Sequence, residues 1–211
     1  MKKCPLFLTI ATAVLALSPT ACDKKGGNPD VYVAGHEYNA AKNNTVATLW
    51  KNGEAQRLND GGSDAGALSV FVSGKDVYVA GIEVNAAKSK VATLWKNGEA
   101  QRLSGGSSNA MASSVFVSGK DVYVAGYEDN AAKNKVATLW KNGEPQPLSD
   151  GSSDAEAYSV FVYGKDVYVA GCAPVNESKL MAFVCKNGFA QTIQTLNDEK
   201  PIAAASAVFV K

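Results

Sequence analysis

The 211-residue chain has one histidine and four cysteines, and no basic tract interrupts residues 30–211. A net charge of +1 without a clustered positive surface argues against nucleic acid, whose phosphates require one. His36 has no identifiable nucleophile or carboxylate partner, and no His/Cys cluster has the spacing of metal ligands. The sequence therefore predicts no metal, no cofactor and no nucleic-acid partner.

The first 22 residues differ in composition from the rest. A basic start, Met1 to Lys3, precedes an apolar stretch from Pro5 to Leu17 that is too short for a comfortable membrane span. Small residues then precede Cys22, a layout that resembles the lipobox of bacterial lipoproteins, although Pro19 stands where Leu is usual. The alternative is ordinary signal cleavage that leaves Cys22 unmodified.

This layout predicts three segments. Residues 1–22 form an export signal with Cys22 as the lipid attachment site, residues 23–29 form a polar tether, and residues 30–211 form the folded domain. We expect a protein of the bacterial cell envelope, periplasmic or on the cell surface, that touches the membrane through its lipid only.

Two cysteines remain in the expected domain, and both lie near its end. Cys172 and Cys185 would meet an oxidising compartment, so a disulfide between them is permitted. Register counting across the intervening hairpin places them a few residues out of opposition. Both the bonded and the free state stay open at this point.

The chain repeats itself. Asp-Val-Tyr-Val-Ala-Gly begins at Asp30, Asp76, Asp121 and Asp166, so the spacings are 46, 45 and 45 residues. Residues 76–120 and 121–165 are identical at 35 of 45 positions. Four tandem copies of one unit are therefore present, and the fourth has changed most.

Each unit contains four strand-like runs rich in β-branched and aromatic residues. In the second copy these runs cover residues 76–83, 91–96, 100–103 and 114–117. Asn97-Gly98 supplies the positive φ angles of a tight hairpin, and residues 118–121 form a second tight turn. The other two connections, residues 85–90 and 104–110, are longer and polar.

These connection lengths predict an all-β fold, a β-propeller with four blades of about 45 residues each. The copies are permuted, because Ser-Val-Phe-Val is the expected innermost strand of a blade and Asp-Val-Tyr-Val-Ala-Gly the second. We expect the C-terminal strand, Ser206 to Val210, to pair with residues 31–35 and close the ring. A solenoid is the second choice of fold, and a homodimer that completes a larger ring competes with the closed monomer.

A short motif resembles those of bacterial extracellular β-propeller families such as the HAF-type repeats. It is Leu-Trp-Lys-Asn-Gly, at residues 49–53, 94–98 and 139–143, and the resemblance extends over residues 30–210. The His-Ala-Phe triplet that gives those repeats their name is missing. The resemblance implies a fold and an envelope or extracellular setting, and no particular activity.

Alternate connections of a blade lie on one face of the ring, so the two long polar loops should share a face. Loops on a rigid scaffold are where binding usually occurs, and repeated loops would give avidity. The candidate ligand-binding residues are Asn39, Lys42, Asn85, Lys88, Asn130, Lys133, Asp150 and Asp154. The alternative is that duplication copied ordinary solvent loops.

Two further patterns are better explained by structure than by binding. Acidic residues around glycines, as in residues 149–154, could ligate calcium, but residues 104–109 have no carboxylate, so turn chemistry is favoured. Trp50, Trp95 and Trp140 could stack on sugars, but packing between blades is favoured.

The sequence favours a non-enzymatic envelope module that binds a glycan or a protein through repeated loops. A structural envelope or assembly scaffold is the alternative. A glycoside-acting enzyme is less favoured, because no acid/base pair stands apart from the repeats.

Overall fold

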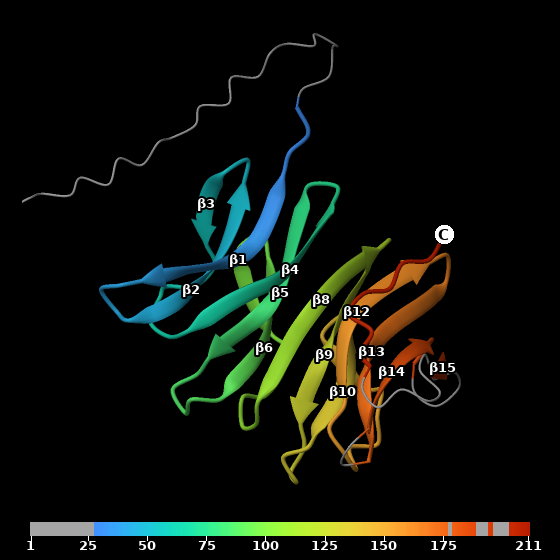
Figure 1. Ribbon diagram of the computed structural model, residues 1–211. Helices are drawn as coiled ribbons and strands as arrows, with labels where there is room; N and C mark the ends of the chain where they lie inside the picture. Colours follow the sequence, from blue (N-terminus) through green and yellow to red (C-terminus); the bar gives the residue numbers. More distant parts are fainter. Residues whose placement is uncertain (1–27, 177–178, 189–193, 196–202) are drawn as a thin grey trace, which may run out of the picture.

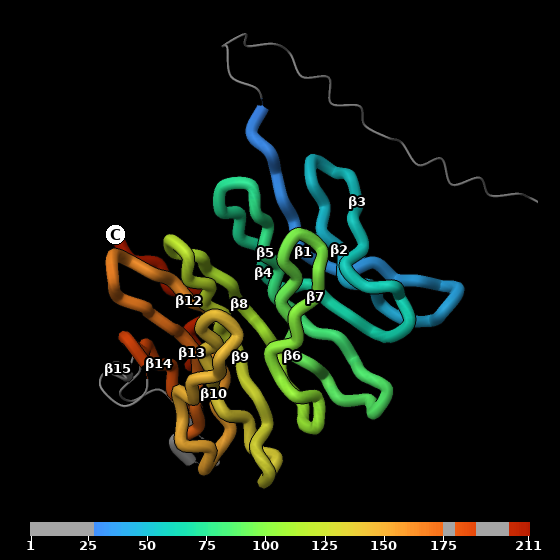
Figure 2. Tube along the Cα trace, turned by 180° about the vertical axis from the view of Figure 1, so that it is seen from behind, coloured from blue at the N-terminus to red at the C-terminus, as the bar shows by residue number. Residues whose placement is uncertain are grey.

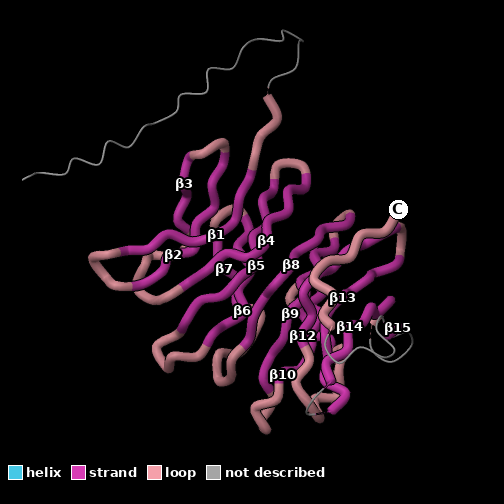
Figure 3. The backbone as a smooth tube through the Cα atoms, in the orientation of Figure 1, coloured by secondary structure: helices cyan, strands magenta, loops and turns pink. Residues whose placement is uncertain are grey.

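The computed structural model of the chain describes residues 28–176, 179–188, 194–195 and 203–211. All regular structure within these ranges is β-strand (Figure 3). The described residues accordingly contain no helix of the length and apolarity that a membrane crossing requires. The expected export signal and its lipid attachment site, Cys22, lie outside the described residues, as does residue range 23–27 of the tether.

The strands form four antiparallel sheets, which follow one another in chain order (Figure 1). The first sheet contains β1 (Tyr32–Asn39), β2 (Asn44–Lys51) and β3 (Glu54–Arg57). The second contains β4 (Ala65–Ser73), β5 (Asp76–Val84), β6 (Lys90–Lys96) and β7 (Glu99–Arg102). The third contains β8 (Ala110–Ser118), β9 (Asp121–Asp129), β10 (Lys135–Lys141) and β11 (Glu144–Pro147). The fourth contains β12 (Glu156–Tyr163), β13 (Asp166–Asn176), β14 (Lys179–Lys186) and β15 (Gln194–Thr195).

The sheets are permuted relative to the sequence repeats, as the connection lengths predicted. The second, third and fourth sheets each begin with a strand that carries Ser-Val-Phe-Val; we call β4, β8 and β12 the inner strands. The first sheet has three strands, and β1 is its edge strand. In the other sheets the strand equivalent to β1 pairs with an inner strand. Among the described residues the first sheet therefore has no inner strand.

The inner strands begin earlier than the sequence indicated. β8 starts at Ala110, four residues before the expected start, and its register with β9 shifts between Ala112 and Ser114. The extra residue of this β-bulge, Ser113, interrupts the alternation of side chains, so the pattern of a strand is hidden in the sequence. The same shift occurs in β4 and β12.

The predicted Asn-Gly hairpins are confirmed. Asn97 has φ 53° and Gly98 has φ 89°, so both central residues are in the left-handed region that a tight hairpin of this type requires. The first and third sheets repeat these angles at residues 52–53 and 142–143. The second tight turn places a glycine at positive φ as well, for example Gly119 at 62°.

The hydrophobic core is divided into three clusters, each between two successive sheets. Trp95 lies in the cluster between the first and second sheets, and Trp140 lies in the next one. Both indole rings are fully buried, so the packing role predicted for them is confirmed. Trp50 is only partly buried, because it lies on the outer face of the first sheet, where no further sheet follows.

The fourth sheet replaces this tryptophan in a way that the repeat did not reveal. Cys185 occupies the position of Trp140, while Phe183 stands two residues earlier on the same face of the strand. An added Cβ at Gly171 would approach the Phe183 ring to 2.8 Å, and at Gly126 it would approach the Trp140 ring to 3.1 Å. Phe183 therefore fills the space that the indole fills elsewhere.

The last described residues, 203–211, which we call the tail segment, lie on the fourth sheet. Ala205 N–H donates to Gly171 O (3.3 Å), and Phe209 stacks edge-on against Phe161 with centroids 4.9 Å apart. The tail segment and β1 are at opposite ends of the row of sheets (Figures 1 and 2). The predicted pairing of the tail segment with residues 31–35 of the same chain is therefore not formed, because the segment continues the stacking of inner strands at the far end.

A polar cluster recurs at the hairpin end of every sheet, and we call it the Asp–Lys–Asn clamp. In the second sheet Asn97 Nδ2 donates to Asp76 Oδ1 (2.9 Å), Lys96 Nζ pairs with Asp76 Oδ2 (3.0 Å), and Lys96 lies over the Tyr78 ring. Val77 N–H donates to Asn97 Oδ1 (2.9 Å). The same contacts occur around Asp30, Asp121 and Asp166.

Acid is expected to destabilise the fold through these four aspartates. Hydrogen bonds from the neighbouring Asn amide and Lys ammonium hold the pKa of Asp30, Asp76 and Asp121 below its ordinary value, and at Asp166 the Lys186 contact is the larger cause. A carboxyl whose pKa is lowered by folding stabilises the protein above its unfolded pKa, and this stabilisation is lost as the pH falls through the folded pKa. The midpoint of thermal unfolding should therefore fall as the pH drops below about 4.

The four-fold Asp→Asn variant tests this expectation. Thermal unfolding followed by circular dichroism between about pH 6 and pH 2 should show a shallower acid loss in the variant, because the titrating carboxyls are gone. An equally steep loss in both proteins would assign the acid sensitivity to other groups.

Candidate functional site

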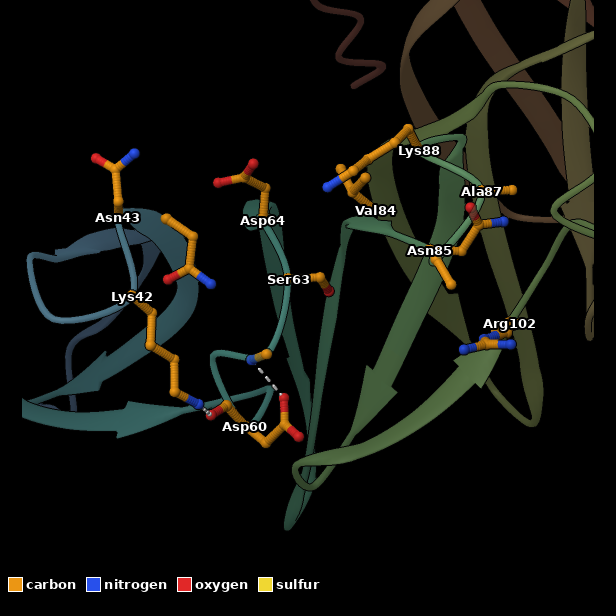
Figure 4. Close-up of a pocket in the computed structure, with 13 residues that line it drawn as sticks. Lys42, Asn43, Asp60, Ser63, Asp64, Val84, Asn85, Ala87, Lys88 and Arg102 are labelled. Atoms are coloured by element: carbon orange, nitrogen blue, oxygen red, sulfur yellow. Dashed lines mark hydrogen bonds between the residues drawn. The ribbon is translucent and has the colours of Figure 1, made fainter.

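The two kinds of long polar loop lie around one hollow, as their alternate positions along each sheet predicted. The hollow has a volume of about 770 Å³ and is lined by residues 42–44, 60 and 62–64, 84–88 and Arg102 (Figure 4). Residues 42–43 belong to the β1–β2 connection, 60–64 to the β3–β4 connection and 85–88 to the β5–β6 connection, while Asn44 begins β2 and Val84 ends β5. We call the side of the molecule that carries these loops the long-loop face, and this space the first hollow.

A second hollow repeats this arrangement one sheet further on. Its volume is about 530 Å³, and its lining consists of Ser89, residues 107–109 and 129–131, and Lys133. Lys133 matches Lys88 of the first hollow in the repeat, and residues 107–109 match residues 62–64. The long-loop face therefore presents one kind of polar site more than once.

The asparagines of this face hold the loops in place. Asn85 Nδ2 donates to Gly106 O (2.7 Å) while its Oδ1 accepts from Ser89 N–H (3.0 Å). Asn130 makes the equivalent bond to Gly151 O (2.8 Å). Each amide thus joins one long loop to the next, and its hydrogen-bonding groups are already engaged by the backbone.

In the first copy a different asparagine performs this role. Asn44 Nδ2 donates to Gly61 O (2.7 Å), whereas Asn39 Oδ1 only accepts from Ala41 N–H (3.2 Å). The residue equivalent to Asn44 in the third copy, Asn134, makes the same bond to Gly151 O (3.0 Å), beside that of Asn130. Sequence alignment of the copies alone pointed to Asn39.

Both acidic candidates already accept hydrogen bonds, one within its own turn and the other from a neighbouring strand. Asp150 Oδ1 accepts from Ser152 N–H (2.9 Å) and Oγ (2.7 Å), and these bonds lower the pKa of Asp150. Asp154 Oδ1 accepts from Lys135 N–H (2.8 Å). The Asp150 contacts are the turn chemistry that the sequence favoured over calcium binding, whereas Asp154 instead joins its loop to β10. Within the described ranges, no three His, Cys, Asp or Glu side chains come together as metal ligands.

The lysines are the candidates that remain available to a ligand. Lys88 and Lys133 end their turns at positive φ angles of 65° and 66°, and both side chains are exposed. Among the described residues neither ammonium group has an ion-pair partner. Lys42 Nζ donates to the Asp60 carbonyl (3.3 Å) at the edge of the first hollow, as Figure 4 shows.

Two functional candidates were not identified from the sequence. Arg102 ends β7 and lines the first hollow, and Glu83 of β5 lines an adjoining space with it. Burial raises the pKa of Glu83, while the Arg102 guanidinium opposes this rise. The first sheet repeats this pair as Arg57 and Glu37 (3.7 Å), whereas the third sheet has Pro147 in place of the arginine.

The other sequence candidates lie apart from the long-loop face. His36 is an exposed residue within β1, opposite Ala47. Cys172 and Cys185 are buried free thiols, and burial raises the pKa of both. Cys172 lies opposite Ala182 in the β13–β14 register, three residues from Cys185 and so roughly 10 Å away along the strand. This exceeds the span of a disulfide, so the candidate bond is not formed.

No protein-family model matches this chain, and no curated protein matches its sequence.

Proposed function

We propose that this chain is a non-enzymatic binding module of the bacterial cell envelope, whose long-loop face holds a glycan. In this proposal the four sheets are blades of a β-propeller, and the N-terminal segment exports the protein and anchors it through a lipid on Cys22. The observation that carries the proposal is the recurrence of one polar, lysine-bearing hollow between successive sheets.

The lining of the hollows favours a hydroxyl-rich ligand with negative charge. The Ser63 hydroxyl and backbone groups of the loops offer donors and acceptors at the surface of the first hollow, and Lys42, Lys88 and Arg102 contribute positive charge. Asp60 and Asp64 oppose this charge, but each already accepts a hydrogen bond from a backbone N–H. An acidic polysaccharide would supply hydroxyls and carboxylates to match.

A protein ligand is less well supported by the same lining. Protein interfaces rely on aromatic, Met or large aliphatic residues that fill pockets at their centre. The apolar residues of the first hollow are Val84, Ala86 and Ala87, and the second has Ala131. Trp95 and Trp140 are in the cores between the sheets, and Trp50 does not line either hollow.

Repetition supports a polymeric ligand. Two hollows one repeat apart can bind successive units of the same polymer, and the second contact then forms at high effective concentration. The hydrogen bonds that the side-chain amides of Asn85 and Asn130 donate fix the loops that frame the hollows. Little ordering of the protein therefore accompanies binding.

The double variant Lys88→Gln, Lys133→Gln should bind an immobilised uronic-acid polysaccharide roughly tenfold more weakly than the unchanged protein, since two exposed charges are lost. Surface plasmon resonance measures the affinity, and binding should weaken as salt is raised. Lys75→Gln, Lys120→Gln is the matched control, because these lysines lie by the tight hairpins at the other end of the sheets. Equal losses in both variants, or no binding of the unchanged protein at high surface density, would contradict the proposal.

A further inference from the structure

We propose that the uncovered edge of β1 binds the tail segment of a second copy of this chain, so that two copies close one ring of eight sheets. The proposal is independent of what the long-loop face binds. It rests on the two ends of the row of sheets, which we call the head (β1 and the neighbouring face of β4) and the tail (residues 203–211).

The head exposes apolar side chains that are covered in the other sheets. Val33 is 51% exposed, whereas its counterparts Val79 and Val124 are 1% exposed. On β4, Val72 is 38% exposed, and its counterpart Val117 is 7% exposed. These exposed residues surround the position where an inner strand of the first sheet would lie. A missing strand, rather than a local change of sequence, therefore explains the exposed head.

The tail segment has the sequence of an inner strand and occupies the position of one. Its residues Ala203 and Ala205 match Ala110 and Ala112 of β8, and 208–210 reads Val-Phe-Val as in every inner strand. Phenylalanines stack from one inner strand to the next and on to the tail: Phe71 with Phe116 (4.7 Å), Phe116 with Phe161 (4.9 Å) and Phe161 with Phe209 (4.9 Å). One hydrogen bond also recurs, from Val115 N–H to Ser69 Oγ (3.2 Å), Val160 N–H to Ser114 Oγ (3.2 Å) and Val208 N–H to Ser159 Oγ (3.1 Å).

The tail segment presents a free edge with nothing beyond it among the described residues. Phe209 is 76% exposed, the highest exposure of any large apolar side chain described. The free edge of the tail segment is the one that faces away from Ser159. In β8 the equivalent edge, which faces away from Ser69, pairs with β9. The tail therefore offers an unpaired backbone edge, and the head offers the strand that it would pair with.

The register of the joint follows from the three complete sheets. Val70, Val115 and Val160 lie opposite Val79, Val124 and Val169. By the same register Val208 would lie opposite Val33, Phe209 opposite Tyr32, and Lys211 opposite Asp30. The last pair brings a cation to a carboxylate, where the complete sheets have Ser73, Ser118 or Tyr163.

A second copy fits this joint because the head and the tail of one chain are at opposite ends of its row (Figures 1 and 2). The tail can stay seated on its own fourth sheet while its outer edge pairs with the head of another chain. In a pair of copies each head then binds the tail of the other copy. Such a closed pair leaves no free edge to which a third copy could add. Own-chain closure would instead require the row to bend until its two ends meet.

Cysteine cross-linking tests which chain supplies the tail. Val33→Cys and Val208→Cys are made in separate chains that start at Asp23, and the two chains are mixed and mildly oxidised. The Cα atoms of directly opposed residues on antiparallel strands are about 4.5–5.5 Å apart, a distance that suits a disulfide. We expect a covalent dimer from the mixture and none from either variant alone, since Cys172 and Cys185 are buried. Light scattering of the unchanged chain should give twice the mass of one copy. A monomer, a cross-link found only within a double-variant chain, or open chains of rising mass would each overturn the proposal.

A variant that should strengthen the dimer tests the joint without relying on a loss that misfolding could also cause. Ala207 occupies the position of Ser69, Ser114 and Ser159, so the tail has no hydroxyl to accept Val70 N–H of the next inner strand. Ala207→Ser should therefore lower the dimer dissociation constant about five- to tenfold, measured by analytical ultracentrifugation. Ala204→Ser is the control, because residue 204 matches Met111 and Glu156, which make no such bond in the complete sheets. An unchanged constant for Ala207→Ser would count against the joint.

Discussion

Gly81→Ala is expected to reduce the free energy of unfolding by about 3–5 kcal/mol, because two backbones pass each other too closely for a side chain. A Cβ on Gly81 of β5 would overlap the Gly66 carbonyl oxygen and lie 3.0 Å from Ala67 Cα, both on the inner strand β4. Backbone cannot move aside as a flexible side chain does, so the strands would have to separate at the β-bulge. Urea unfolding followed by tryptophan fluorescence measures the change.

Gly66→Ala is the matched control on the same strand pair. An added Cβ there meets nothing within 4 Å, and the third and fourth sheets carry Met111 and Glu156 at this position. We expect its unfolding free energy to stay within about 0.5 kcal/mol of the unchanged protein. Similar losses for Gly81→Ala and Gly66→Ala would mean that general strand propensity, not the close approach, sets the cost.

A substitution at Gly35 tests how the head differs from the complete sheets. Its added Cβ would meet only the Trp50 ring, at 3.0 Å, because no inner strand lies beside β1. Gly35→Ala should therefore cost a single chain much less than Gly81→Ala, while placing a methyl group where a docked tail would pass. Gel filtration should show this variant shifted toward the monomer. A folded variant that still forms the dimer would argue against strand pairing at this edge.

The sequence was informative where a structural requirement repeats with the unit. Asn97 and Gly98 revealed the hairpin because few residue pairs adopt positive φ, and the position of the long connections revealed which strand begins a sheet. The bulge at Ser113 was hidden, because an inserted residue breaks the alternation on which a strand is recognised. Phe183 was hidden too, because a ring from two residues away can fill the same space. Whether the ends of the row meet depends on small angles between sheets, which no residue pattern encodes.

The candidate site was predictable in place but not in detail. Connection order alone placed the long loops on one face, and Lys88 and Lys133 are exposed there. The neighbouring Asn85 is an anchor, a role that depends on a carbonyl 21 residues away in the chain and so is invisible locally. Arg102 was missed because it lies on a strand and not in a long loop, and because only the first two copies carry an arginine there.

Trp140→Ala is expected to reduce the free energy of unfolding by about 3–5 kcal/mol, because it empties the centre of the core between the second and third sheets. The indole is fully buried among Ala, Leu and Val side chains, which cannot collapse into the space without moving both sheets. For a domain of this size the midpoint of thermal unfolding should fall by roughly 10 °C. Differential scanning calorimetry measures the midpoint.

Trp140→Phe separates the volume of the ring from its N–H group. The buried Trp140 Nε1 donor has no hydrogen-bond partner among the described residues, so its removal breaks no hydrogen bond there, and the variant should lose less than half as much stability as Trp140→Ala. Trp50→Ala provides the comparison at the head, where the ring is partly exposed and the loss should be smaller at low protein concentration. If the joint between copies forms, the loss at Trp50 should grow with protein concentration, because the docked tail then covers that ring. A loss at Trp50 that equals the loss at Trp140 in dilute, monomeric protein would show that the first sheet is already covered within one chain.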